Sequence, residues 1–173
     1  MANKVARYLI QNGEFQDDVL HRTCFPVNIR LLKENWSYMH IIEGIISHML
    51  EVMEEKFSDY PKCQGISGAN VGIPFNIVII KSRKGNIVML NPEIIAHSSE
   101  TVATESNCGS INLEEKIIVT RYKEVTVKYI DWPEEEDFEV IGSFNEQIKT
   151  FKSGTVQHEI DHNNGILIID RAK

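Results

Sequence analysis

The stretch Gln157-His158-Glu159-Ile160-Asp161-His162-Asn163-Asn164-Gly165 decides how the rest of the chain is interpreted. On a helix, His158 and His162 lie four residues apart and therefore project from the same face. Two imidazoles at this spacing can bind one divalent metal ion, and Glu159 lies where a carboxylate can act as a general base. The alternative interpretation is a solvated helix with incidental histidines, but this arrangement is rare by chance in 173 residues. We therefore expect a metal site on this helix.

The composition predicts one soluble domain that spans residues 1–173, since 42% of the residues are hydrophobic and 25% are charged. A net charge of −7 argues against a nucleic-acid partner, which would require clustered Lys and Arg. No secretory signal is visible, and no apolar run approaches the ~20 residues of a membrane helix. The three cysteines form an odd count, which fits a reducing compartment. The expected location is therefore cytoplasmic, without a membrane partner.

Hydrophobic periodicity predicts a single α+β domain. A long helix is expected over 31–57, where apolar residues repeat every three or four positions. Strands are expected at 77–80, 87–90, 91–95, 116–120, 124–130, 138–142 and 166–169. Two segments rich in small residues, 63–74 and 105–110, lie between these elements, and 96–104 is expected to be a polar connection. The last helix is expected to begin between 143 and 146 and to end at Gly165 in a left-handed cap.

Two histidines do not complete a catalytic metal site, which usually has three protein ligands and an open position. Only eleven residues follow His162, and a third histidine at the metzincin spacing would fall at Ile168. The third ligand is therefore expected upstream. Its candidates are Cys24, Cys63, Cys108, His21, His40, His48 and His97. Cys108 has the most suggestive setting, among small and polar neighbours, but spacing alone leaves the choice open.

Three segments, in this order, resemble the three motifs of the peptide deformylases. The first family motif ends in Ala-Ala-Pro-Gln before Val-Gly-Ile, and here Ser67-Gly68-Ala69-Asn70 precedes Val71-Gly72-Ile73. The second, Glu-Gly-Cys-Leu-Ser, is similar to Ser106-Asn107-Cys108-Gly109-Ser110, and the third, His-Glu-x-x-His, is matched in full. Supporting similarity runs through 91–93, 119–121 and 165–170, so the resemblance covers nearly the whole chain.

The resemblance implies a deformylase-like fold, with short mixed β-sheets around a central helix that carries the His-Glu-x-x-His motif. It implies a metal held by Cys108, His158 and His162, with Fe²⁺ in the cell and Zn²⁺, Ni²⁺ or Co²⁺ after purification. The expected activity is removal of the N-formyl group from the formyl-methionine of newly made polypeptides. A metal-bound hydroxide would be the nucleophile and Glu159 the general base. The partner would be an N-formylated nascent peptide, with room for a transient contact with the ribosome.

The resemblance also implies roles around the metal. The Asn70 side chain and the Gly109 backbone N–H correspond to the donors that stabilise the oxyanion. The peptide would bind in an extended form, with its methionine side chain in an apolar pocket. Residues expected to contact the peptide are Gly65, Ile66, Asn107, Phe151 and Thr155.

Several positions depart from the family motifs. Asn70 replaces the usual glutamine, so its amide is one methylene, about 1.5 Å, shorter. Gly109 replaces a leucine, which removes an apolar wall, and Ser106-Asn107 replaces Glu-Gly. Two further hypotheses therefore remain: an amide hydrolase with another N-acyl substrate, and a non-catalytic protein that binds metal or peptides. Retention of Glu159 favours an enzyme, because a binding site would not need this carboxylate.

Overall fold

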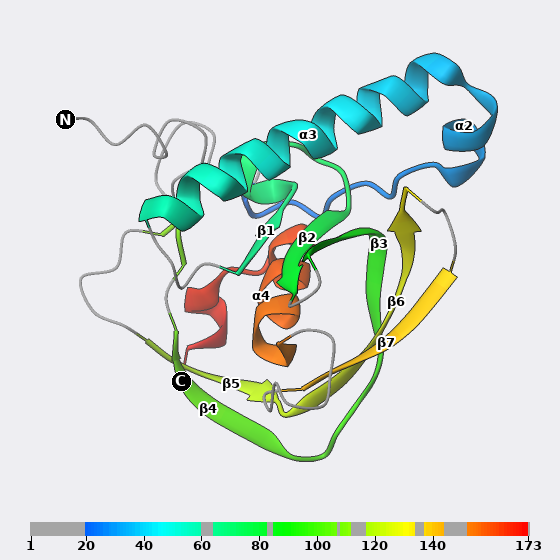
Figure 1. The fold of residues 1–173 in the computed structure, drawn as a ribbon. Helices are drawn as coiled ribbons and strands as arrows, with labels where there is room; N and C mark the ends of the chain where they lie inside the picture. The colour runs from blue at the N-terminus through cyan, green and yellow to red at the C-terminus, as the bar shows by residue number, and fades with distance from the viewer. Residues whose placement is uncertain are drawn as a thin grey trace.

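The computed structural model describes residues 20–59, 64–82, 85–106, 108–111, 117–133, 137–143 and 152–172, and it describes 56–59 and 137–143 by their backbone alone. Helices and strands form the α+β arrangement that the sequence predicts (Figure 1). The elements in chain order are α2 (Ile29–Glu34), α3 (Trp36–Asp59), β1 (Gly65–Ser67), the 3-10 helix η2 (Ala69–Val71), β2 (Ile77–Ser82), β3 (Gly85–His97), β4 (Thr101–Ser106), β5 (Ile117–Tyr122), β6 (Glu124–Trp132), β7 (Asp137–Ser143), α4 (Ser153–Asn163) and the 3-10 helix η3 (Ile168–Arg171).

Helix α3 confirms the long predicted helix, although the prediction placed its start too early. The residues 31–34 belong to the separate helix α2, and Asn35 between the two helices has an extended backbone. The Asn35 side chain accepts a hydrogen bond from the Tyr38 N–H at 2.9 Å and so caps the start of α3. The predicted single helix is therefore divided by one asparagine that ends α2 and begins α3.

The strands form a five-stranded antiparallel sheet in the order β1-β2-β3-β6-β7 and a two-stranded antiparallel sheet, β4-β5. The predicted strands 87–90 and 91–95 are parts of one strand, β3, whose pairing with β6 is irregular between Leu90 and Glu93. At this irregularity Asn91 has a φ of 53°. Strand β4 differs from the prediction of a polar connection over 96–104, because its residues pair with β5 although their composition is not typical of a strand. The predicted strands over 77–80, 116–120, 124–130 and 138–142 are confirmed within one or two residues at their described positions.

Strand β2 explains how the large sheet lies between two helices. Alternate residues of a strand face opposite sides of its sheet, so an unbroken apolar run can be buried on both faces. Ile77 and Ile79 belong to one apolar cluster with residues of α3, such as Met49. Val78 and Ile80 belong to another cluster with Val156 and Ile160 of α4. Helix α4 therefore lies on the face of the sheet away from α3, with β4 and β5 on its other side (Figure 1).

Helix α4 begins at Ser153, later than the sequence predicted, and Ser143 is the last residue of β7 instead. Gly165 confirms the predicted left-handed cap, because its φ is 71° and a Cβ there would lie 2.6 Å from the His21 carbonyl oxygen. The predicted strand 166–169 is wrong. Its second half belongs to η3, where the Leu167 N–H donates to the Asp170 carboxylate at 2.7 Å. No helix in the described ranges is long and apolar enough to cross a membrane.

Candidate metal centre

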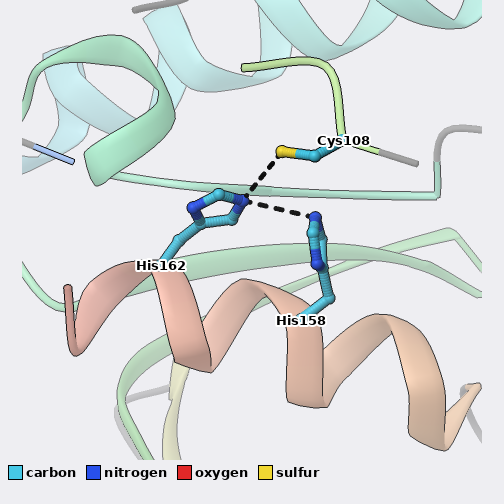
Figure 2. A group of neighbouring side chains, drawn as sticks. All are labelled: Cys108, His158 and His162. Atoms are coloured by element: carbon cyan, nitrogen blue, oxygen red, sulfur yellow. Dashed lines mark hydrogen bonds between the residues drawn. The ribbon is translucent and has the colours of Figure 1, made fainter. Parts of the chain in front are cut away.

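Three potential ligand atoms converge beside α4. His158 and His162 project from the same face of the helix, and their Nε2 atoms lie 3.3 Å apart. Cys108 approaches from the loop between β4 and β5, and its Sγ lies 3.2 Å from His162 Nε2 (Figure 2). The ligand atoms of all three residues lie within 4.8 Å of one another. The structure therefore brings together the three residues that the sequence predicted as ligands.

The spacing of these atoms fits one metal ion. With metal–nitrogen bonds of about 2.0 Å and metal–sulfur bonds of about 2.3 Å, tetrahedral ligands lie about 3.3 Å (N···N) and about 3.5 Å (N···S) apart. The observed distances of 3.3 Å and 3.2 Å are close to these values. A thiolate with two imidazoles is a donor set suited to Zn²⁺ and to Fe²⁺. In the described ranges no second group of three such side chains converges.

The other described candidates for the third ligand lie elsewhere. His40 pairs with Glu43 on the exposed surface of α3, and His97 stacks on the Tyr122 ring at a centroid distance of 3.6 Å. The Cys24 thiol lies near the Asn163 side-chain oxygen, and burial raises its pKa to about 11, so at neutral pH it stays protonated. Cys63 lies outside the described residues.

The Cys108 sulfur receives a backbone hydrogen bond within its own loop. The Ser110 N–H donates to Sγ at a distance of 3.4 Å. A donor at this position favours the thiolate, which is the form that binds metal. Gly109, whose N–H was predicted to stabilise an oxyanion, lies between these two residues and is exposed.

The predicted general base lies beside the predicted peptide-binding segment. Glu159 is buried and faces Gly65 of β1, where a Cβ would lie only 2.9 Å from Glu159 Cγ and 2.9 Å from Thr155 Cγ2. Gly65, Thr155 and Glu159 are therefore neighbours, and the glycine leaves the space that the other two residues occupy. The Ile66 side chain is buried in the core under α3, so only its backbone can contact a peptide. Asn107 and Phe151 lie outside the described residues.

Asn70 lies in η2 and is nearly buried. Its Oδ1 accepts hydrogen bonds from the Ser67 N–H at 2.9 Å and from the Ser67 hydroxyl at 2.7 Å. Its Nδ2 donates to the Ser110 hydroxyl oxygen at 3.0 Å, next to the loop that carries Cys108. The short amide thus connects the first small-residue segment to the second, a contact that the sequence did not predict.

Comparisons with known proteins identify the family to which this chain is related. The model of the polypeptide deformylase family matches residues 13–173. The chain belongs to the peptide deformylase family. A peptide deformylase from Thermotoga neapolitana is 30% identical over 160 residues, which cover 92% of this chain and 84% of that protein. Members of this metal-dependent family are hydrolases that remove N-formyl groups.

Solved deformylase structures share the fold. The crystal structure of the Thermotoga maritima peptide deformylase has a TM-score of 0.71 and 29% identity, and the match covers 96% of this chain and 97% of that one. A class I type b peptide deformylase from Acinetobacter baumannii with bound Met-Ala-Ser has a TM-score of 0.69 and 29% identity, covering 94% and 96% of the two chains. The deformylase-like α+β fold expected from the sequence is therefore confirmed.

Two side chains of α4, neither of them predicted from the sequence, hold this helix against its neighbours. Asp161 binds Arg121 of β5 and Arg171 of η3, each at 2.7 Å. The Gln157 amide accepts from the Tyr122 N–H at 3.1 Å and donates to the Tyr122 carbonyl oxygen at 2.9 Å, as a neighbouring strand would. The only signal in the sequence was their position, since Asp161 lies inside the His-Glu-x-x-His motif and Gln157 directly precedes it. These contacts fix the orientation of the helix that carries His158 and His162.

Proposed function

We propose that this chain is a metal-dependent hydrolase that removes the N-formyl group from the formyl-methionine of newly made polypeptides. The observation that carries the proposal is the convergence of the Cys108 thiol and two imidazoles at the helix that also carries the buried Glu159. Membership of the deformylase family supports the reaction. The resident ion in the cell is proposed to be Fe²⁺, with Zn²⁺, Ni²⁺ or Co²⁺ after purification.

In this proposal, Cys108, His158 and His162 would hold the ion, which would supply Lewis acidity to the reaction. Glu159 accepts the proton of the attacking water and returns a proton to the leaving amine. The bond between the formyl carbon and nitrogen breaks, so one water and one formylated peptide become formate and a free N-terminus. Asn70 and Gly109 donate hydrogen bonds to the oxygen that becomes negatively charged.

The peptide is proposed to lie in an extended form beside β1, in contact with Gly65, Ile66 and Asn107. The Acinetobacter baumannii relative with bound Met-Ala-Ser supports a peptide substrate. The closeness of Gly65 to Thr155 also supports this placement, because it brings the backbone of β1 beside one residue of the proposed methionine pocket. Phe151 is the second proposed pocket residue. We place the reaction in the cytoplasm, with a transient contact to the ribosome.

A direct test is anaerobic expression with Fe²⁺, metal analysis and an assay of formate release from formyl-Met-Ala-Ser. Acetyl-Met-Ala-Ser is the matched control, and cleavage of that peptide would favour a hydrolase with another N-acyl substrate. A protein that holds about one metal ion per chain but releases neither acid would contradict the proposed activity and favour a role limited to binding.

A further inference from the structure

Three buried side chains form a hydrogen-bonded chain between the two small-residue segments. Ser67 in β1, Asn70 in η2 and Ser110 beside Cys108 are 0%, 3% and 0% exposed. Ser67 binds the Asn70 Oδ1 through both its backbone N–H and its hydroxyl group, and the Asn70 Nδ2 donates to Ser110 Oγ. The outer two residues thus hold the amide from opposite ends.

A count of donors and acceptors shows how far the amide is restrained. A side-chain amide has one oxygen with two lone pairs and one nitrogen with two hydrogens. The two bonds from Ser67 occupy the oxygen, and Ser110 takes one Nδ2 hydrogen. The amide plane is therefore fixed, because a rotation about its last bond would break all three bonds. The second Nδ2 hydrogen is the remaining donor of this group.

The same restraint connects Asn70 to the candidate metal centre. Ser110 accepts from Asn70 through its hydroxyl oxygen and donates to Cys108 Sγ through its backbone N–H. One residue thus sets the position of the amide relative to the thiol. Electrostatic stabilisation of a transition state depends on donors that are already in position. An anchored donor therefore stabilises the transition state more than a mobile donor does.

We propose that Ser67 and Ser110 are positioning residues, which orient the short Asn70 amide so that its second Nδ2 hydrogen serves the deformylation reaction. This inference rests on the proposed function. It gives Ser67 a specific role, since that hydroxyl stands where the family motif carries an alanine and lies three residues before the shortened amide.

If Ser67 orients Asn70, the effect on kcat of changing one of these residues should depend on the identity of the other. Asn70→Gln alone inserts a methylene into a side chain held at both ends, and we expect kcat to fall about tenfold. The double variant Ser67→Ala/Asn70→Gln removes the hydroxyl that the longer side chain would displace, and we expect it to recover most of this loss. A double variant that is no faster than Asn70→Gln alone would contradict the inference.

Ser110→Ala tests the other end of the amide. We expect kcat for formyl-Met-Ala-Ser to fall about tenfold with KM and metal content unchanged, and Ser110→Thr, which keeps the hydroxyl, to retain most of the rate. Ser37→Ala, an exposed serine on α3, is the matched control. An unchanged kcat in Ser110→Ala would overturn the proposed role. If that variant does not fold, Ser67→Ala carries the same test, with the same expected loss of kcat.

A measurement on the metal-free protein separates the inference from the proposed function. In ¹⁵N NMR spectra, one hydrogen of the Asn70 side-chain amide should exchange slowly with solvent in the wild type and faster in Ser110→Ala. Equal exchange in both proteins would contradict the anchored amide whatever the activity. Absence of formate release from the wild type, with the slow exchange preserved, would contradict the proposed function and the catalytic use of the amide, but not the anchoring.

Discussion

Helix α4 and the neighbouring segment from β1 to η2 both contribute residues to the candidate site, and different forces position their side chains. On α4 the backbone itself sets the spacing of His158 and His162, and packing against the sheet holds the helix. On the other side, three side-chain hydrogen bonds position Asn70. The helical side depends on regular structure, whereas the other side depends on contacts between residues that lie up to 40 positions apart.

This difference indicates which parts of the site tolerate substitutions. Helical spacing survives most substitutions as long as the helix forms, so the ligand set and the base can be retained while other positions vary. A side-chain amide that is held by several hydrogen bonds, such as that of Asn70, tolerates substitution only if its hydrogen-bond partners are substituted as well.

Replacement of Cys108 by Ala should remove the proposed third metal ligand, which comes from the loop between β4 and β5. We expect the metal content to fall from about one ion per chain to near zero and formate release to fall with it, because two imidazoles alone leave the site incomplete. Metal analysis of the purified variant measures this. Cys24→Ser is the matched control, since this buried cysteine lies outside the ligand group and should leave the metal content unchanged. Full metal occupancy in the Cys108 variant would show that the third ligand lies elsewhere.

Replacement of Glu159 by Gln should separate catalysis from metal binding on the helical side. The amide preserves the shape of the buried carboxylate but cannot accept the water proton, so we expect kcat to fall about 10³-fold. Steady-state kinetics with formyl-Met-Ala-Ser, together with metal analysis, measures both properties. A loss of metal as large as the loss of rate would instead give Glu159 a structural role.

Replacement of Gly65 by Ala tests where the two sides touch. The added methyl group would lie 2.9 Å from carbon atoms of Glu159, Thr155 and Ile80, so these side chains must shift to make room for it. A displacement of about 1 Å at the base can cost up to 10²-fold in rate, and we expect a fall of kcat between about 10-fold and 10²-fold with metal content unchanged. Gly44→Ala is the control, because a Cβ there meets nothing within 4 Å. Equal rates in the two variants would show that Glu159 does not depend on the space at Gly65.

Replacement of Asp161 by Asn should destabilise the fold rather than change the chemistry directly. Arg121, whose side chain is 6% exposed, would lose its buried anionic partner, which typically costs about 3 kcal/mol or more in free energy of unfolding. Urea denaturation of the metal-free protein measures this. Glu100→Gln breaks the exposed pair with Lys123 and is the control, with no resolvable change in the midpoint expected. A midpoint for Asp161→Asn equal to that of the control would contradict the anchoring role.

Sequence reasoning could predict the helical side of the site because the relevant information is local. The spacing of His158, Glu159 and His162 follows from 3.6 residues per turn, and the structure places them as that period requires. Cys108 could not be chosen from spacing, since its approach depends on how the loop after β4 packs against α4. The family resemblance supplied that choice, and the geometry agrees with it.

The errors in the predicted elements have physical reasons. Strand β4 has the small and polar residues Thr101–Ser106, and its pairing with β5 rather than its composition makes it a strand. The apolar run 166–169 resembles a strand, but Leu167 and Ile168 are buried at the start of η3. The hydrophobic pattern predicts one long helix across Asn35, because a capping hydrogen bond leaves no trace in such a pattern. In each case contacts outside the local pattern determined the structure.

The contact between Cys108 and His162 also has a consequence for the stability of the fold. These residues are 54 positions apart, so a metal ion held by both acts as a cross-link that closes a long loop. By analogy with a disulfide, closing such a loop lowers the entropy of the unfolded chain by an amount worth about 4 kcal/mol. Chelation should therefore lower Tm as well as abolish turnover. During synthesis, the chain could gain this stability only after α4, which carries His162, has been made.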